Sequence, residues 1–214
     1  LMIAGELDIS VGSMVPAGSM TTAIIAGHYG LPIWLAIAAV LLLGIVVGLI
    51  NGSLVVRTAV PSFIVTLGTF NIAFAITQQY SNAQTGTDLP PMMTWLGSTF
   101  PLGGASVTFG TVLMILLYLG MWFWLRETGA GRHVYAVGNN PEATRLVGIP
   151  TERVMLGVYV LAGVFYGIAS LLSVARTGVG DPNAGQTEAL DAITAVVLGG
   201  TSLFGGRGVI LGTL

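Results

Sequence analysis

Three long apolar runs divide the chain, and each is long enough to cross a lipid bilayer as an α-helix. They contain no Asp, Glu, Lys or Arg and comprise Leu31–Ile50, Ser106–Leu125 and Val154–Ala175. A helix that rises about 1.5 Å per residue needs about 20 residues to cross about 30 Å of hydrocarbon. The pattern therefore predicts three membrane-spanning helices. Burial inside a soluble protein is the weaker interpretation, because little polar sequence remains to cover a water-facing surface.

The remaining apolar stretches are interrupted by Gly and Pro. Val11–Ala26 contains both residue types and is barely long enough to span, and Thr58–Tyr80 is interrupted by Pro61 and Gly68. Ala192–Gly206 is too short to cross, and its two Gly-Gly pairs should break it. Non-helical backbone at membrane depth is tolerated only where protein or a water-filled cavity surrounds it, so several breaks favour a transport pathway over simple kinks. We expect an all-α fold, a polytopic transmembrane helical bundle with broken, re-entrant helices.

Composition agrees with a protein embedded in lipid. Of the 214 residues, 54% are hydrophobic and 7% are charged, whereas soluble domains carry about 25% charged residues. A net charge of −2 gives no attraction to nucleic acid, and the absence of Cys excludes disulfides and thiolate metal sites. The chain starts and stops within apolar sequence, so we expect residues 1–214 to be one membrane domain that is incomplete at both ends.

The distribution of Arg predicts the orientation in the membrane. Four of the seven Arg lie in the polar segment Arg126–Arg153, between two predicted spans. The positive-inside rule places this segment in the cytoplasm. Ser81–Ala105 and Arg176–Leu190, which carry acidic residues and prolines, then lie on the opposite side. The side of Leu1–Ala26 stays open, because a re-entrant segment there would change the count of crossings.

A short helix, joined by short linkers to the two flanking spans, is predicted within the cytoplasmic segment, and Gly129 and Gly131 should end the first of these spans. Asn139 or Asn140 can serve as its N-cap, and Pro141 suits the first helical position. Glu142 falls in the first turn, where the helix dipole favours an anion, and Gly148 ends the helix. An isolated helix of about seven residues is marginal in water. We therefore expect its apolar side to pack either on the ends of its own spans or in a groove of a partner.

The residues of this helix resemble a known signature. Glu142, Ala143 and Thr144, followed by Gly148, resemble the Glu-Ala-Ala-x-x-x-Gly pattern of ABC-transporter permeases, with Thr144 where the pattern prefers Ala. Four phrases resemble permeases for ribose, xylose, galactose and related sugars: GELDISVGS (Gly5–Ser13, with Glu6 in place of a usual Gly), VPSFIVTLGT (Val60–Thr69), TGAGRHVYAVGNNPEATRLVGI (Thr128–Ile149) and EALDAITAVVLGGTSLFGGRG (Glu188–Gly208). A fifth, RTGVGDPNAGQ (Arg176–Gln186), is most similar to the fructose and ribose branch.

The resemblance covers nearly the whole chain and implies a permease subunit of a bacterial ATP-binding-cassette importer for a monosaccharide. It implies a coupling helix that docks on a cytoplasmic ATPase subunit, with ATP and Mg²⁺ bound by that partner, through Asn140, Pro141, Glu142, Ala143, Thr144, Arg145, Leu146 and Gly148. It also implies a second permease subunit in a homodimer, a periplasmic sugar-binding protein and the bacterial inner membrane. Family members are longer at both ends, in line with an incomplete domain.

Polar residues in the broken segments are candidates for a sugar path, because sugars are neutral and rich in hydroxyls. The candidates are Ser10, Asn51, Ser62, Phe63, Thr66, Thr69 and Asn71. Such residues also hold membrane helices together by hydrogen bonds, and this alternative stays open. Asp8 and Asp191 each precede a Gly-broken apolar segment. We interpret them as caps or first-turn carboxylates of half-helices, with direct sugar contact as the alternative.

No catalytic or metal-binding pattern is present, so we expect a transporter subunit rather than an enzyme, with no cofactor bound by this chain. A Walker-type phosphate loop requires Lys, which the chain lacks, so ATP hydrolysis must occur on another polypeptide. Two alternative functions remain. A secondary transporter driven by an ion gradient would need an ionisable residue within a span, and the three clean spans have none. A non-transporting membrane scaffold subunit would need no polar breaks.

Overall fold

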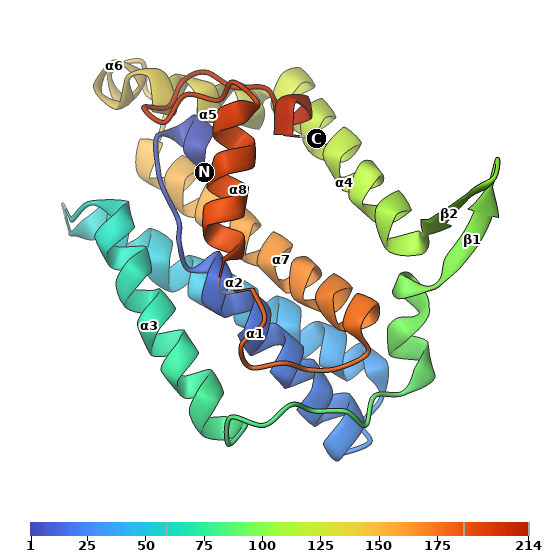
Figure 1. The fold of residues 1–214 in the computed structure, drawn as a ribbon. Helices are drawn as coiled ribbons and strands as arrows, with labels where there is room; N and C mark the ends of the chain where they lie inside the picture. The colour runs from blue at the N-terminus through green and yellow to red at the C-terminus, as the bar shows by residue number, and fades with distance from the viewer. Residues whose placement is uncertain (59, 186, 214) are drawn as a thin grey trace.

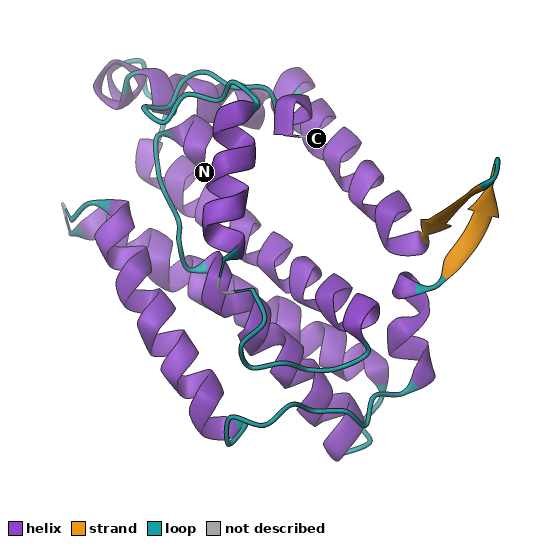
Figure 2. Ribbon diagram, viewed as in Figure 1, coloured by secondary structure: helices purple, strands orange, loops and turns teal. Residues whose placement is uncertain are grey.

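Helices make up most of the protein (Figures 1 and 2), and the computed structural model describes residues 1–58, 60–185 and 187–213. Ala59, Gln186 and Leu214, which fall within stretches discussed above, lie outside the described residues. In chain order the elements are η1 (Met2–Ala4), α1 (Val11–Thr22), the π-helical η2 (Ala23–His28), α2 (Ile33–Arg57), α3 (Ser62–Tyr80), η3 (Pro91–Gly97), β1 (Thr99–Leu102), β2 (Ala105–Thr108), α4 (Phe109–Glu127), α5 (Gly129–Asn139), α6 (Pro141–Leu146), α7 (Thr151–Thr177), α8 (Glu188–Leu198) and η4 (Ile210–Thr213).

Within the described part of the chain, α2, α4 and α7 are long and apolar enough to cross a membrane. They coincide with the three predicted spans and confirm them. The predicted start of the second span at Ser106 was wrong, because residues 106–108 belong to strand β2, which pairs antiparallel with β1. The helix begins only after Thr108, whose hydroxyl oxygen accepts a hydrogen bond from the Thr111 N–H at 3.1 Å and caps α4.

α1 is the central helix of the bundle, with α2, α3 and α7 packed around it (Figure 1). Pro16 lies inside α1 without ending it. Neighbouring helices donate to other carbonyls of α1: Ser170 Oγ donates to Met14 O at 3.1 Å, and the Tyr80 hydroxyl donates to Ala17 O at 2.8 Å. α1 is buried around Pro16, so protein and not lipid surrounds the hydrogen bond that this residue cannot make.

α2 and α7 pack with their backbones in contact. Gly44 of α2 faces Gly163 of α7, and a Cβ atom built on either residue would overlap the carbonyl oxygen of the other. Gly48 lies one turn further along α2, against the backbone of Tyr159. Small residues at such positions allow membrane helices to approach closely, where van der Waals contact replaces the hydrophobic effect as the source of affinity.

The expected breaks in the apolar stretches form at some glycines and not at others. α3 runs through Gly68 without interruption, so the predicted break there was wrong, and Pro61 serves as its N-cap residue. α8 ends at Gly199 as expected, and the following Gly200, Gly205 and Gly206 all have positive φ. At 11 residues, α8 is about 16 Å long, which is about half of the hydrocarbon thickness.

The polar segment between α4 and α7 contains a helix that the sequence analysis missed. Gly129 and Gly131 were expected to end the preceding span and open a loop. Instead they begin α5, because the Thr128 side chain accepts a hydrogen bond from the Gly131 N–H at 3.1 Å and caps a new helix. α5 therefore separates α4 from α6, and the short helix is not joined directly to both spans as the sequence had led us to expect.

The two half-helices α1 and α8 begin near each other in the middle of the bundle and run to opposite ends (Figure 1). An extended segment, residues 5–10, connects η1 at the α6 end to the start of α1. At the opposite end, Gly86 and Gly180 exchange two backbone hydrogen bonds of 2.8 Å each. These two glycines belong to Ser81–Ala105 and Arg176–Leu190, the segments that the sequence analysis predicted to lie on the same side of the membrane.

Candidate functional site

α6 projects from one end of the bundle (Figure 1) and has defined caps at both ends. Asn140 is its N-cap residue, since the side-chain oxygen accepts a hydrogen bond from the Ala143 N–H at 2.9 Å. Asn139, the other candidate, is the last residue of α5. Gly148 adopts a φ of 87°, a conformation that would strain any residue with a side chain, and so ends the helix.

The apolar side chains of α6 face away from the rest of the chain. Leu146 and Val147 are 88% and 75% exposed, and we refer to this pair as the apolar knob. Thr144 makes the contact with the bundle instead, as it is only 5% exposed and its hydroxyl lies 2.9 Å from the carbonyl oxygen of Ala136 in α5. The spans of this chain therefore leave the apolar knob uncovered.

The candidate residues for a sugar path gather around the extended segment 5–10. The Leu7 N–H donates to Ser62 Oγ and the Ile9 N–H donates to Thr66 Oγ1, each at 3.2 Å. Both hydroxyls belong to α3 and are buried. They supply hydrogen bonds to backbone that neither a helix nor a sheet satisfies, which is a requirement for irregular chain at membrane depth.

A second set of hydrogen bonds ties the same segment to α2. Asp8 Oδ1 accepts from both the N–H and the hydroxyl of Ser10, at 2.8 and 2.6 Å. Asn51 Nδ2 donates to Ser10 Oγ at 3.1 Å, and the Thr69 hydroxyl donates to Asn51 Oδ1 at 2.6 Å. The N-cap residue of α1 is Ser10, and Asp8 holds that residue in place from two positions upstream.

The other predicted residues lie apart from this network. Phe63 is exposed on the surface of α3, and the exposed Asn71 donates only to Leu67 O of its own helix, at 2.8 Å. Asp191 lies in the first turn of α8 beside Glu188. Its carboxylate is on the exposed side of the helix, where the helix dipole favours it.

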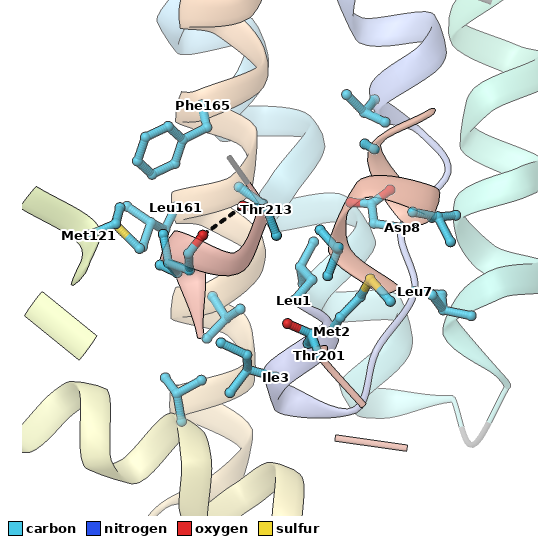
Figure 3. A pocket seen from close by; sticks show the side chains of 18 of the residues that line it. Leu1, Met2, Ile3, Leu7, Asp8, Met121, Leu161, Phe165, Thr201 and Thr213 are labelled. Atoms are coloured by element: carbon cyan, nitrogen blue, oxygen red, sulfur yellow. Dashed lines mark hydrogen bonds between the residues drawn. The ribbon is translucent and has the colours of Figure 1, made fainter. Parts of the chain in front are cut away.

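A cavity of about 330 Å³ lies between α4, α7, α8 and the N-terminal segment (Figure 3). Met121 of α4 and Leu161 and Phe165 of α7 line one side, and residues 1–3 line another. Asp8 is the one member of the predicted sets that lines it. Few polar groups converge here, so the cavity lacks the dense hydrogen bonding that sugar hydroxyls need. Across the described residues, no group of three metal-ligating side chains is close enough to hold an ion.

Residues 1–214 match the family described as branched-chain amino acid transport system / permease component. The chain belongs to this permease family. It is 38% identical over 219 residues to the fructose import permease protein of Rhizobium meliloti and 37% identical over 220 residues to the ribose import permease protein of Escherichia coli K12. It is 32% identical over 273 residues to the xylose transport system permease protein of Haemophilus influenzae.

These three alignments include all of the present permease chain and 61%, 67% and 72% of the length of the relatives. The chain thus spans about three fifths of the length of the first of them. No solved structure matches it significantly. The comparisons confirm the family resemblance drawn from the motifs, and they confirm a helical membrane permease, which is a transporter component rather than an enzyme.

The polar network of the permease predicts that two Asn→Leu substitutions have very different effects. Asn51 is 1% exposed and bridges two helices and the extended segment. Asn51→Leu should therefore cost about 1–3 kcal/mol, the penalty for leaving buried polar partners unsatisfied. Asn71→Leu is the matched control, because Asn71 is exposed and bonds only its own helix. Apparent melting temperatures in detergent should fall for the first variant alone, and equal melting temperatures would contradict a structural role for the network.

Proposed function

We propose that the protein is the permease subunit of an ATP-driven bacterial importer for a monosaccharide of the fructose or ribose type. The observation that carries the proposal is the apolar knob, two large aliphatic side chains held in the open at the polar end of a membrane bundle. The named relatives are import permeases for fructose and ribose, which supports the substrate class.

The chemistry of α6 suits docking into a groove of a partner protein. Burying an aliphatic side chain of this size contributes about 1.5–3 kcal/mol, so burial of the apolar knob would stabilise a complex with a partner. Glu142, Ala143 and Arg145 are exposed around it and supply a polar rim. A short helix inserted into a groove is a common recognition mode. The partner that we infer is a cytoplasmic ATPase subunit, which binds ATP and Mg²⁺.

The Arg-rich segment around α6 supports a cytoplasmic location for this end of the bundle under the positive-inside rule. The opposite end, where residues 81–90 and 178–183 meet, then faces a periplasmic sugar-binding protein. Two copies of the chain form the transport path in the inner membrane. Alternating access is the mechanism, and the half-helices α1 and α8 are the elements placed to change position, because broken helices mark the moving parts of many transporters.

A secondary transporter driven by an ion gradient is the weaker alternative. It would depend on Asp8, the ionisable residue of the predicted sets that lines the cavity. Asp8 accepts two hydrogen bonds from Ser10 at the start of α1 and has the Tyr166 side chain of α7 as a further hydrogen-bond partner, so a structural role accounts for this carboxylate.

Single cysteines test the docking and the orientation together. The 214 residues contain no Cys, so Leu146→Cys and Met92→Cys each add a single thiol to them, and any Cys elsewhere in the full-length permease is first replaced by Ser. Both side chains are well exposed, at 88% and 75%, but at opposite ends of the bundle. Leu146→Cys should react with an impermeant maleimide only in inverted vesicles and should crosslink to the ATPase subunit. Met92→Cys should react only in right-side-out vesicles and form no such crosslink. Labelling of Leu146→Cys from the outside would overturn the proposal.

A further inference from the structure

α5 makes backbone contact with two segments that are distant in sequence. Gly138, in the last turn of α5, lies so close to η1 that a Cβ atom built on it would overlap the carbonyl oxygen of Ile3. The same Cβ atom would lie 2.7 Å from the backbone nitrogen of Gly206. Three parts of the chain therefore meet at Gly138 with no side chain between them.

The two distant segments also contact each other. The Gly206 N–H donates to Ile3 O at 2.8 Å. A Cβ atom built on Gly205 would lie 2.7 Å from both Gly138 O and the Cα atom of Gly5. We call Gly5, Gly138, Gly205 and Gly206 the glycine junction. It is a backbone-to-backbone contact of three segments at the α6 end of the bundle, where the chain after α8 crosses beside α5 (Figure 1).

A side-chain hydrogen bond strengthens the junction. The Tyr135 hydroxyl of α5 donates to Gly208 O at 2.8 Å. Burial raises the pKa of Tyr135 above its usual value, so the phenol keeps its proton and stays a donor. α5 thus holds the segment after α8 at two places, through Gly138 and through Tyr135.

Each segment that enters the junction leads directly to a half-helix. From Ile3 the chain passes through Gly5 and the extended segment 5–10 into α1. From Gly205 and Gly206 it runs back to the end of α8 at residue 198. Both half-helices border the cavity, α1 through Val11 and α8 through residues such as Ile193.

α6 is fastened to the C-terminal end of α5. A single residue, Asn140, separates the two helices, and the Thr144 hydroxyl lies 2.9 Å from Ala136 O. The Asn140 N–H donates to Ala136 O at 3.0 Å, so the turn between the helices is itself hydrogen-bonded. Displacement of α6 therefore reaches α5 directly, in addition to α7, which follows α6 in the chain and also contacts it.

We propose that the glycine junction is the positioning element that carries displacement of α6 through α5 to both half-helices at once, with α5 and the two leading segments moving as one rigid unit. Contact between backbones transmits displacement without loss, because no flexible side chain lies between the segments to absorb it. The proposal rests on the proposed function, since it assumes that α6 is moved by an ATPase.

A substitution at Gly138 tests the junction, with a matched control in the same helix. Gly138 has ordinary helical backbone, so Gly138→Ala adds a methyl group without conformational strain and pushes α5 away from η1. Gly129→Ala makes the same change at the start of α5, where the nearest atom to the new Cβ is a flexible Arg132 nitrogen at 4.0 Å. In proteoliposomes with the complete transporter, sugar uptake per ATP hydrolysed should fall about tenfold in Gly138→Ala and stay unchanged in Gly129→Ala. An unchanged ratio in Gly138→Ala would overturn the proposal.

A second variant tests the junction without adding a side chain to it, so it does not depend on the folding of Gly138→Ala. Tyr135→Phe removes only the hydroxyl that donates to Gly208 O and keeps the ring. Sugar uptake per ATP hydrolysed should fall severalfold in Tyr135→Phe, while co-purification with the ATPase subunit stays unchanged. A wild-type ratio in Tyr135→Phe would show that α5 does not move the segment after α8 through this contact and would overturn the proposal. A failure of the proposed function is distinguishable, because then Leu146→Cys would not crosslink to the ATPase at all.

Discussion

Replacing Leu146 and Val147 with Asp is expected to abolish sugar uptake while the protein still folds and inserts. Both side chains are almost fully exposed, so the substitutions remove no contact within the chain. In the complex each change removes about 1.5–3 kcal/mol of apolar burial and places a charge in a groove that excludes water. The combined loss corresponds to a reduction in ATPase affinity of about a hundredfold or more. Co-purification with the ATPase subunit and uptake in vesicles both measure it.

A conservative pair of substitutions separates loss of the apolar knob from damage to the fold. Leu146→Met with Val147→Ile keeps apolar side chains of similar volume, so this variant should bind the ATPase and transport normally. Wild-type uptake by the double Asp variant, at wild-type abundance in the membrane, would contradict docking through α6.

Gly163→Leu is expected to prevent folding, because it places a large side chain where two helix backbones touch. Extra methylene groups in a packed core usually cost about 1–3 kcal/mol when side chains can rearrange. At Gly163 the facing atom is the carbonyl oxygen of Gly44, and a backbone atom cannot turn aside. α2 and α7 would have to separate, and both also pack on the central helix α1. The yield of monodisperse protein in detergent should fall to near zero.

Gly157→Leu provides the control on the same helix. Gly157 lies two turns from Gly163 on α7, but no atom lies within 4 Å of a Cβ atom built there. The two substitutions add the same apolar volume and carry the same helix propensity, so only the space available differs. Gly157→Leu should give wild-type yield, and equal yields for both variants would disprove tight α2–α7 packing.

The local physics of the sequence was enough to locate the spans and the caps of α6. Whether a helix can cross a bilayer depends on the length and transfer free energy of its own residues, so α2, α4 and α7 could be predicted from hydropathy. A cap depends on residues a few positions apart, so Gly148 could be named before the structure was known, and the N-cap could be narrowed to Asn139 or Asn140.

Glycines misled the sequence analysis at two places. Gly68 lies inside a continuous helix, while Gly129 and Gly131 begin one, although all three were expected to interrupt structure. The available signal for α5 was Thr128, a good N-cap residue three positions before Gly131. The low helix propensity of glycine pointed the other way, but the propensity of single residues is a weak guide that the context can override.

For the polar residues, too, the sequence predicted the chemistry and the fold decided the partner. Their chemistry marked Ser10, Asn51 and Thr66 as hydrogen-bonding groups at membrane depth, and the structure uses them to satisfy segment 5–10. Whether such a side chain bonds the protein backbone or a sugar depends on which groups lie next to it in the fold. The spacing of residues in the sequence does not give those neighbours.

Hydropathy and capping thus established the membrane class, the three spans and the short helix α6, because each depends on neighbours in the chain. The junction around Gly138, the close approach of Gly44 to Gly163 and the cavity beside Asp8 emerged only in the folded molecule. The role of a glycine depends on which atoms occupy the space that a side chain would fill. In this protein those atoms belong to residues distant in the chain, Gly163 for Gly44 and both Ile3 and Gly206 for Gly138, so their roles could be assigned only from the fold.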